Sequence, residues 1–349
     1  MSHHKLFGYI GTYTRGESKG IYRFKLDTEK GIITDIEVAS SLQNPTYLAI
    51  SKDNKYLYSV VKEGKQGGVA AFLIHHETKS LELLNIQVQD GAPPCHVNVD
   101  DENQTVVIAN YHKGTVESYV VNGELQTVTS IIRHKGSGPN EERQEKAHTH
   151  YAAFTPDQQY VVAVDLGTDQ LVTYALHNGV LTKVNELRIK PGSGPRHLAF
   201  HPNGTYAYMM TELSSEIIVL IYHAENGSFQ EIQSISTLPK DWSEESYGSA
   251  IHISADGRFV YAANRGHNSI ALFQVNDMTG ELQFIEYTHT EGHWPRDFEL
   301  DPTGTFLVAA NEKSNNLALF LRDKETGQLK VLHSRIEVPE PVCVKFLHI

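Results

Sequence analysis

The sequence is poor in cysteine and has no long apolar run. Its only two cysteines, Cys95 and Cys343, cannot build the disulfide framework of a small secreted protein. No stretch approaches the roughly 18 apolar residues of a membrane-spanning helix, and the start of the chain, MSHHKLFGYIGTY, lacks the apolar core of a signal peptide. We therefore expect a cytoplasmic protein with no membrane partner.

Basic residues are also scarce. The 349 residues include 30 Lys and Arg against 42 Asp and Glu, a net charge of −12 that is spread along the chain. Such a surface repels nucleic acid, so we expect no nucleic-acid partner. The 26 glycines and 17 tyrosines, with only 4 methionines, favour strands and turns over helices.

A repeat runs through the whole chain. Each unit has an anchor residue, a short alternating run, a turn and an unbroken apolar run that ends in Asn or a similar residue. The anchors are spaced 46 to 55 residues apart and are Pro45, Pro94, Thr149, Pro195, Gly248, Pro295 and Pro341. This period is typical of the four-stranded blades of a β-propeller.

Each unit divides into four predicted strands. The first strand follows the anchor, and a turn such as residues 202–204 leads into the second strand. The second strand is the unbroken apolar run, for example residues 259–263, which indicates burial on both faces. The third strand alternates, as in residues 269–275, and a turn such as residues 325–327 leads into the fourth strand.

The two ends of the chain complete one another. Residues 1–44 supply a second, third and fourth strand, whereas the chain from Pro341 onwards supplies only a first strand. Pairing these segments makes one blade and removes exposed sheet edges; in the alternative, an open solenoid, the ends should resemble polar caps, and they do not. We therefore predict an all-β fold, a seven-bladed β-propeller with four antiparallel strands per blade. Residues 1–349 form a single domain in this prediction, and the C-terminal strand closes the ring by joining the N-terminal blade.

Blade geometry brings two sets of residues to one mouth of the central channel. The turns at the opposite face are nearly uniform, but the mouth positions vary while staying polar, which favours a ligand site. The residues directly after the anchors are Thr46, Cys95, His150, Arg196, Ser249, Arg296 and Val342, and the next ones are Tyr47, His96, Tyr151, His197, Ala250, Asp297 and Cys343. The residues after the second strands are Thr12, Lys62, Tyr111, Leu166, Glu212, Arg265 and Glu312. We expect two long connections, residues 134–148 and 238–247, to rim this mouth.

Three arginines stand out at the mouth of so acidic a chain. Arg196, Arg265 and Arg296 each offer a planar fork that suits phosphate or carboxylate. Structural ion pairs with nearby carboxylates are the alternative. Glu212 and His150 are the candidate proton-transfer groups, although a structural role stays open for either.

The metal signals are weak. The pair His148 and His150 has no acidic or cysteine partner at a helpful spacing. Asn and Asp recur at the strand ends and could hold calcium, but bonds to the local backbone explain the repetition more simply. The recurring residues are Asn110, Asp165, Asn264 and Asn311. We therefore expect no metal and no cofactor.

Several longer motifs point to a known family. They are Lys135-Gly-Ser-Gly-Pro-Asn, Gly194-Pro-Arg-His-Leu-Ala-Phe-His-Pro, Thr211-Glu-Leu-Ser-Ser, Asn264-Arg and Pro295-Arg. With them the whole chain resembles the bacterial 6-phosphogluconolactonase family of seven-bladed propellers, relatives of the fungal carboxy-cis,cis-muconate cyclases. The resemblance implies a hydrolase, a lactonase of the pentose phosphate pathway acting on 6-phosphoglucono-1,5-lactone. It also implies that the catalytic residues are His150, Arg196, Glu212 and Arg265.

The expected ligand is a small anionic sugar lactone. The residues expected to bind it are Arg296, His197, His96, Tyr111 and Lys313. In the expected reaction an arginine pair holds the phosphate, Glu212 or His150 takes a proton from water, and another arginine stabilises the oxyanion. A muconate-type cycloisomerase and a non-catalytic binding propeller remain alternatives, and the expected assembly is a monomer or weak homo-oligomer.

Overall fold

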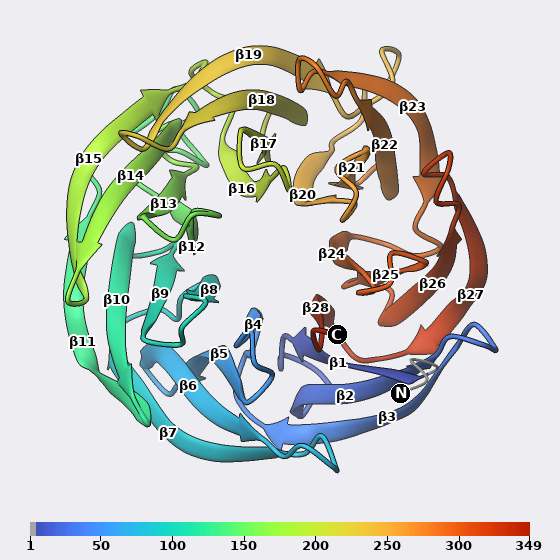
Figure 1. Ribbon diagram of the computed structural model, residues 1–349, viewed down its shortest axis with the longest axis horizontal. Coiled ribbons are helices and arrows are strands. Elements are labelled where there is room, and N and C mark those ends of the chain that lie inside the picture. The colour runs from blue at the N-terminus through green and yellow to red at the C-terminus, as the bar shows by residue number, and fades with distance from the viewer. Residues whose placement is uncertain (1–4) are drawn as a thin grey trace.

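Strands surround a central channel in this protein. The structure is a computed structural model that describes residues 5–349, and these residues form 28 strands in seven four-stranded antiparallel sheets (Figure 1). Each sheet is one blade, with its first strand nearest the channel and its fourth strand at the rim. The predicted seven-bladed β-propeller is confirmed. None of the described residues belongs to a helix long and apolar enough to cross a membrane.

Each blade runs through four strands from the channel outward. Blade 1 contains β28 (Pro341–Phe346), β1 (Lys5–Thr12), β2 (Gly20–Asp27) and β3 (Ile32–Ser41). Blade 2 contains β4 (Leu48–Ile50), β5 (Tyr56–Glu63), β6 (Gln66–Ile74) and β7 (Leu81–Asp90). Blade 3 contains β8 (His96–Val99), β9 (Thr105–Asn110), β10 (Thr115–Asn122) and β11 (Glu124–Arg133). Blade 4 contains β12 (Thr149–Phe154), β13 (Tyr160–Asp165), β14 (Gln170–His177) and β15 (Val180–Arg188).

The remaining three blades follow the same order. Blade 5 contains β16 (Pro195–Phe200), β17 (Tyr206–Thr211), β18 (Glu216–His223) and β19 (Ser228–Ser236). Blade 6 contains β20 (Tyr247–Ile253), β21 (Phe259–Arg265), β22 (Ser269–Val275) and β23 (Leu282–His289). Blade 7 contains β24 (Pro295–Leu300), β25 (Phe306–Asn311), β26 (Asn316–Arg322) and β27 (Leu329–Glu337).

The ring closes as the sequence predicts, because β28 pairs antiparallel with β1 and becomes the innermost strand of blade 1. An apolar cluster backs this closure. Phe24 and Phe346 of blade 1 pack with Phe306 and Leu319 of blade 7, and the rings of Phe24 and Phe346 lie 5.1 Å apart. Burying one such aromatic side chain stabilises the fold by about 1.5–3 kcal/mol.

Apolar packing between neighbouring blades holds the ring together. Residues 5–349 contain seven buried clusters, one for each pair of adjacent blades. The second strands contribute to two clusters at once, and every residue of β9 and β25 is buried. Unbroken apolar runs therefore mark these strands because both of their faces meet another blade.

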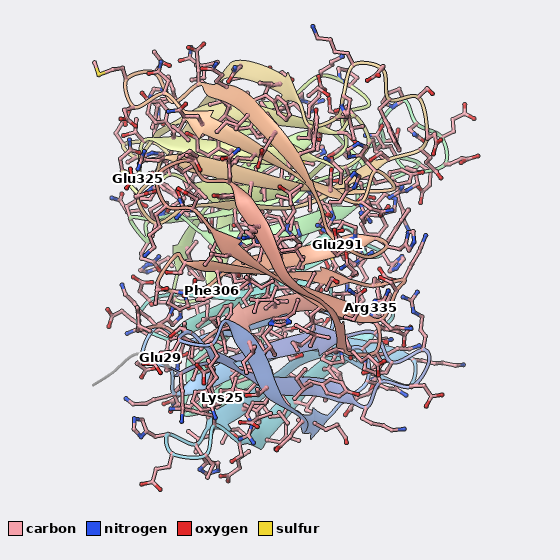
Figure 2. The ribbon with its side chains drawn as sticks, turned by 90° about the vertical axis from the view of Figure 1, so that its right-hand side faces the viewer. Lys25, Glu29, Glu291, Phe306, Glu325 and Arg335 are labelled. Atoms are coloured by element: carbon pink, nitrogen blue, oxygen red, sulfur yellow. The ribbon has the colours of Figure 1, made fainter. Side chains whose placement is uncertain are left out.

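The two faces of the ring carry different kinds of loop. In Figure 2, Glu29 and Glu325 lie on one face, in turns between third and fourth strands, whereas Glu291 lies on the other face, in the connection from blade 6 to blade 7. We call these the turn face and the connection face. The starts of the first strands and the ends of the second strands meet at the connection face.

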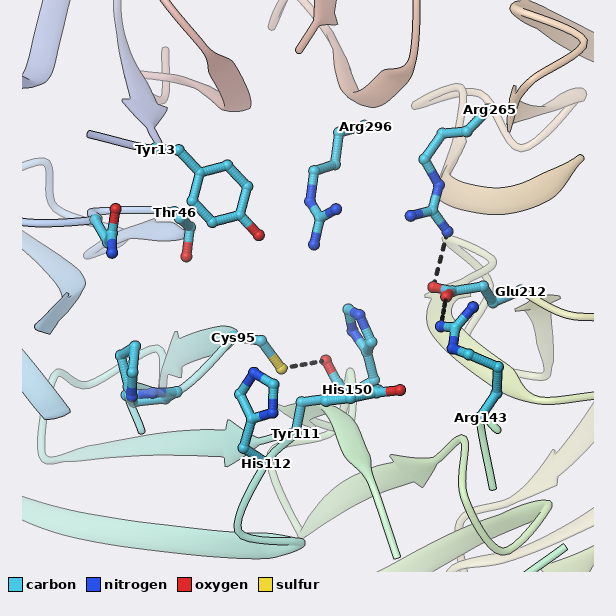
Figure 3. A pocket seen from close by; sticks show the side chains of 13 residues that line it. Tyr13, Thr46, Cys95, Tyr111, His112, Arg143, His150, Glu212, Arg265 and Arg296 are labelled. Carbon is cyan, nitrogen blue, oxygen red and sulfur yellow. Dashed lines mark hydrogen bonds and ion pairs between the residues drawn. The ribbon is translucent and has the colours of Figure 1, made fainter. Parts of the chain in front are cut away.

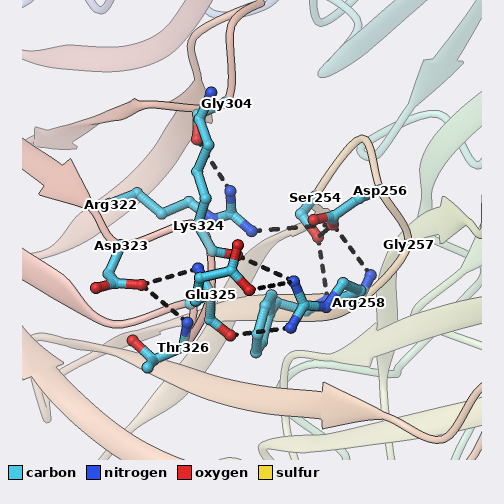
Figure 4. A network of polar contacts seen from close by, with 12 residues as sticks. Ser254, Asp256, Gly257, Arg258, Gly304, Arg322, Asp323, Lys324, Glu325 and Thr326 are labelled. Atoms are coloured by element: carbon cyan, nitrogen blue, oxygen red, sulfur yellow. Dashed lines mark hydrogen bonds and ion pairs between the residues drawn. The ribbon is translucent and has the colours of Figure 1, made fainter.

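The turn face has a structural role between blades 6 and 7 (Figure 4). The buried Arg322 donates from Nε to the Tyr261 hydroxyl at 2.7 Å and from Nη1 to the Gly304 carbonyl at 2.9 Å. Arg258 donates to the Glu325 carbonyl at 3.0 Å. The Arg322–Tyr261 bond joins strands of blades 7 and 6, and the Arg258–Glu325 bond joins turns of the same two blades. The Arg322–Gly304 bond lies within blade 7.

Candidate active site

A cavity of about 380 Å³ opens at the connection-face mouth of the channel (Figure 3). Inner strands, second-strand ends and interblade connections all contribute to its wall. The lining residues are Tyr13, Asn44, Thr46, Pro93, Pro94, Cys95, Tyr111, His112, Arg143, His150, Glu212, Arg265 and Arg296. The predicted residues His150, Glu212, Arg265, Arg296 and Tyr111 thus meet in one pocket.

A β-bulge places three of the predicted side chains. The register between first and second strand shifts across His150 in β12, across Arg196 in β16 and across Arg296 in β24. Each of these residues is therefore an extra residue of its strand, with no partner on the neighbouring strand. A bulge of this kind re-aims the side chain, which no longer follows the regular alternation between the two faces of the sheet. The same irregularity thus occurs at two residues that line the cavity, His150 and Arg296, and at Arg196, which contacts Glu212.

Glu212 is the hub of the charged groups. Its carboxylate lies 3.1 Å from Arg196 Nε, 2.8 Å from an Arg265 Nη and in contact with an Arg143 Nη, and its side chain is only 4% exposed. Burial alone would raise the pKa of Glu212, but Arg265 and Arg196 overcome it and hold the pKa well below the usual range. Glu212 is therefore ionised and poorly suited to accept a proton.

The two inner arginines of this hub are firmly held. Arg265 also donates to the Gly248 carbonyl at 2.7 Å, and an Arg196 Nη lies 3.3 Å from His197 Nε2. Burial and the neighbouring Arg265 lower the pKa of Arg196. Arg196 is not among the residues that line the cavity, so it contributes charge and orientation through its contact with Glu212.

Arg296 is held more loosely. Its ion-pair contact within residues 5–349 is with Glu312, 3.6 Å away, and Glu312 also contacts Arg15 at 2.5 Å. The ring of Tyr13 lies 3.8 Å from the Arg15 guanidinium and 5.4 Å from that of Arg296. Figure 3 shows the Arg296 guanidinium pointing toward the centre of the pocket, where its donors are free to meet a ligand.

His150 is a neutral, buried imidazole. Burial and the charge of Arg196 lower the pKa of His150 well below its ordinary value. Its Nδ1 has no hydrogen-bond partner among residues 5–349. Cys95 lies next to it and donates to the His150 carbonyl at 3.5 Å, and burial raises the pKa of the Cys95 thiol to about 11. The histidine is thus held in its neutral form, although as a weaker base than a free imidazole, and the thiol is not a nucleophile.

His96 and His197 do not reach this pocket, contrary to the grouping predicted from the sequence. They lie one residue deeper in their strands and line a second cavity of about 390 Å³ further along the channel. The rings of Tyr47 and Tyr151 lie 4.2 and 4.4 Å from that of His96, and both lie 5.7 Å from that of His197. Tyr151 and His197 directly follow the bulged residues of β12 and β16, and together with Tyr47 and His96 they line this second cavity.

Lys313 also lies outside the pocket. Its ammonium group sits 3.3 Å from the centre of the Trp294 ring and lines a separate depression beside Arg15 and Glu312. The Lys313 amide bonds to the His293 carbonyl at 3.1 Å, which carries the chain away from the channel. The expectation that Lys313 joins the substrate-binding group is not supported by this position.

The sequence did not single out Arg143 or Tyr13, which both line the pocket. Arg143 belongs to the connection 134–148, whose length did predict a place at the mouth. Within its run of mixed charges, however, nothing distinguishes this arginine from its neighbours. Tyr13 directly follows Thr12, one of the predicted mouth positions.

The repeated Asn and Asp residues serve the backbone. The side-chain amides of Asn110, Asn264 and Asn311 donate to carbonyls of the preceding connections at 2.7–2.8 Å. Asp165 accepts backbone bonds from His148 and Gly167. Within residues 5–349 no group of three or more His, Cys, Asp or Glu is arranged to hold a metal ion. The local-backbone interpretation of this repeat is confirmed.

Comparisons with known proteins agree with this geometry. A family model described as "Lactonase, 7-bladed beta-propeller" matches residues 7–346. The 6-phosphogluconolactonase of Bacillus subtilis (strain 168) is 57% identical over 346 residues, covering 99% of both chains. A solved structure of a Lactobacillus plantarum protein is 41% identical with a TM-score of 0.94, over 98% of this chain and 99% of that one. The Pseudomonas aeruginosa periplasmic gluconolactonase PpgL is 30% identical with a TM-score of 0.93, over the same shares. This chain therefore belongs to the family of seven-bladed β-propeller lactonases.

Proposed function

We propose that this protein is a 6-phosphogluconolactonase, which hydrolyses 6-phosphoglucono-1,5-lactone to 6-phosphogluconate in the pentose phosphate pathway. The full-length similarity to the Bacillus subtilis enzyme supports the reaction. The observation that carries the proposal is a neutral, unpartnered His150 in the same pocket as a cluster of arginines. That combination supplies a base and a site for an anion together.

The charge of the pocket suits a phosphorylated substrate. Three arginines surround the single carboxylate of Glu212, which leaves two positive charges in excess at this hub. A phosphate ester carries close to two negative charges at neutral pH. Guanidinium groups recognise such a group through paired, charge-assisted hydrogen bonds. The excess charge therefore attracts the substrate and fixes its orientation.

In the proposed mechanism, His150 is the general base. It takes a proton from a water molecule while the water oxygen attacks the lactone carbonyl carbon, forming a tetrahedral intermediate with a negative oxygen. Arg296 stabilises that oxyanion, since its guanidinium points into the pocket and is only loosely paired. The bond between the carbonyl carbon and the ring oxygen then breaks, and the ring oxygen takes the proton from His150 to become an alcohol.

Glu212 has a different part in this proposal. Because its pKa is held well below the usual range, it stays charged and orients Arg196 and Arg265 rather than moving a proton. The sequence leaves open whether Glu212 or His150 is the base. We assign the base to His150, because Glu212 is engaged by three arginines whereas Nδ1 of His150 has no hydrogen-bond partner within residues 5–349. Tyr111 lines the same wall and is assigned to substrate binding.

Two broader features accompany the proposal. We infer that residues 1–349 act as a single domain and that the enzyme works in the cytoplasm as a monomer or weak homo-oligomer. The cytoplasm is where phosphorylated sugars of this kind are produced and used.

The test is hydrolysis of freshly generated 6-phosphogluconolactone, followed by proton release at constant pH. We expect the protein to accelerate the reaction well above the spontaneous rate measured in the same buffer. A rate equal to the spontaneous one at high protein concentration would contradict the proposal and favour the non-catalytic binding propeller.

A further inference from the structure

Arg143 is the most accessible of the three arginines on Glu212. Its side chain is 30% exposed, whereas those of Arg196 and Arg265 are 3% and 5% exposed. It is also the pocket arginine that comes from an interblade connection rather than from a blade strand. Arg143 is therefore the part of the hub that an incoming ligand meets near the surface.

The connection holds Arg143 in a fixed place. The adjacent Gln144 is fully buried, and its side-chain amide donates to the Leu166 carbonyl at 2.8 Å and accepts from the Asn140 amide at 3.2 Å. The side-chain oxygen of Asn140 in turn accepts the Arg143 backbone N–H at 3.1 Å. A group whose backbone is fixed in this way loses little freedom when it binds a ligand.

Arg143 has donors to spare. A guanidinium carries five N–H donors. Arg143 contacts Glu212 through one Nη and also hydrogen-bonds the side chains of Tyr111 and Tyr247, and the ring of Tyr247 lies 5.4 Å from its centre. Arg196 and Arg265 already outweigh the charge of Glu212 without it. Arg143 is thus not needed to neutralise the buried carboxylate, and it lines the cavity itself.

Arg143 and Arg296 reach the pocket from different sides, with His150 closer to the centre (Figure 3). In the mechanism above, His150 and Arg296 act on the lactone carbonyl. In the lactone ring C5 is bonded to the ring oxygen, so the phosphate on C6 stands across that oxygen from the carbonyl carbon. As a group outside the ring it meets a different part of the wall from the carbonyl. Arg143 is the surplus cation on that wall.

Building on the proposed function, we propose that Arg143 binds the phosphate of the substrate and makes the enzyme prefer phosphorylated over unphosphorylated lactones. Gln144 is its positioning residue. The family motif did not include this arginine, and it lies in a connection, where specificity can change without disturbing the blades.

The experiment compares two substrates and two variants. Initial rates on 6-phosphogluconolactone and on glucono-1,5-lactone give kcat/KM for the wild type, Arg143→Gln and Arg143→Lys, with Arg188→Gln as a control at an exposed rim position. Losing a charge-assisted bond should lower kcat/KM for the phosphorylated lactone by about 10- to 150-fold more than for the unphosphorylated one in Arg143→Gln. The lysine variant, which keeps the charge but not the fork, should fall between. Melting temperatures check that each variant is folded.

Binding of the product separates this inference from the proposed reaction. Calorimetry should show that Arg143→Gln weakens the binding of 6-phosphogluconate by a factor similar to the loss in kcat/KM. The binding of gluconate should not change. Equal losses on both substrates, or no loss on either, would overturn the assignment of Arg143. If the wild type hydrolyses neither lactone, the proposed function is wrong, and calorimetry still decides whether Arg143 recognises phosphate. If the wild type does not bind 6-phosphogluconate, the assignment of Arg143 to the phosphate is wrong as well.

Discussion

At the scale of single residues, His150 depends on one irregularity in β12. As the extra residue of a bulge, it is aimed at the channel mouth while still buried by its neighbours. Burial and Arg196 then keep its imidazole neutral, which is the form that the proposed general base must have, while making it a weaker base than a free imidazole. Its neighbour Cys95 is buried too, and for a thiol the same burial prevents the reactive, ionised form. The same buried environment thus keeps the imidazole of His150 neutral and the thiol of Cys95 protonated.

Replacing His150 by Asn should therefore remove the base and little else. We expect kcat for 6-phosphogluconolactone to fall by about 100-fold or more, because asparagine cannot accept a proton at neutral pH. The melting temperature should change little, since Nδ1 of His150 has no partner to lose within the described chain. His177→Asn, at an exposed position of β14, is the matched control. Retention of wild-type kcat in a folded His150→Asn protein would exclude this histidine as the base.

At the scale of strands, the sequence predicts where each element lies but not how its side chains are aimed. Turn residues and unbroken apolar runs locate β9, β21 and β25, because burial between two blades leaves a clear pattern. The bulges leave none, since any residue can occupy the extra position. For this reason the sequence groups His96 and His197 with the mouth, although both line the second cavity. Of the two, His197 directly follows a bulged residue, Arg196.

Side chains from connections are equally hard to foresee. Arg143 reaches Glu212 because Gln144 is buried beside it, and neither residue is part of a repeating pattern. For Lys313 the sequence instead predicts a contact that the structure lacks. This lysine follows the mouth position Glu312, but its ammonium group packs on the ring of Trp294 rather than in the pocket. The position of a residue in the repeat therefore predicts the region in which its side chain lies, but not the individual contacts that the side chain makes.

The closing strand β28 is tied to blades 6 and 7 by a charged network. Lys345 Nζ lies 2.7 Å from a carboxylate oxygen of Glu299, and His252 lies 3.2 Å from Glu299 and 3.7 Å from Asp297. Burial alone would lower the pKa of His252, but Glu299 and Asp297 raise it from 6.5 to about 9. The protonated imidazole is therefore the form that the fold stabilises.

This network makes stability depend on pH in a defined direction. A raised pKa means that the contribution of His252 is fully present below its unfolded value of 6.5 and is lost as the pH rises through about 9. Between pH 6.5 and 9.5, the melting temperature of the wild type should fall by roughly 1–5 °C more than that of His252→Gln, which cannot titrate. His177→Gln should behave like the wild type. Identical pH dependence in the wild type and His252→Gln would show that this histidine is not held in its charged form.

At the scale of the whole molecule, the ring separates structure from chemistry. The turn face joins blades 6 and 7 through polar contacts, such as that of Arg322 with Tyr261. The connection face gathers His150, Arg196, Arg265 and Arg296 from four consecutive blades, although they are far apart in the sequence. Because the blades and their seven apolar interfaces supply the stability, the mouth can hold buried charges that do not pack well.

The most direct test of this account is a crystal structure of the protein with 6-phosphogluconate bound. The account predicts the product in the connection-face cavity, with its carboxylate beside His150 and Arg296 and its phosphate on Arg143. Product bound instead in the second cavity, below the rings of Tyr47 and His96, or on the turn face, would contradict it.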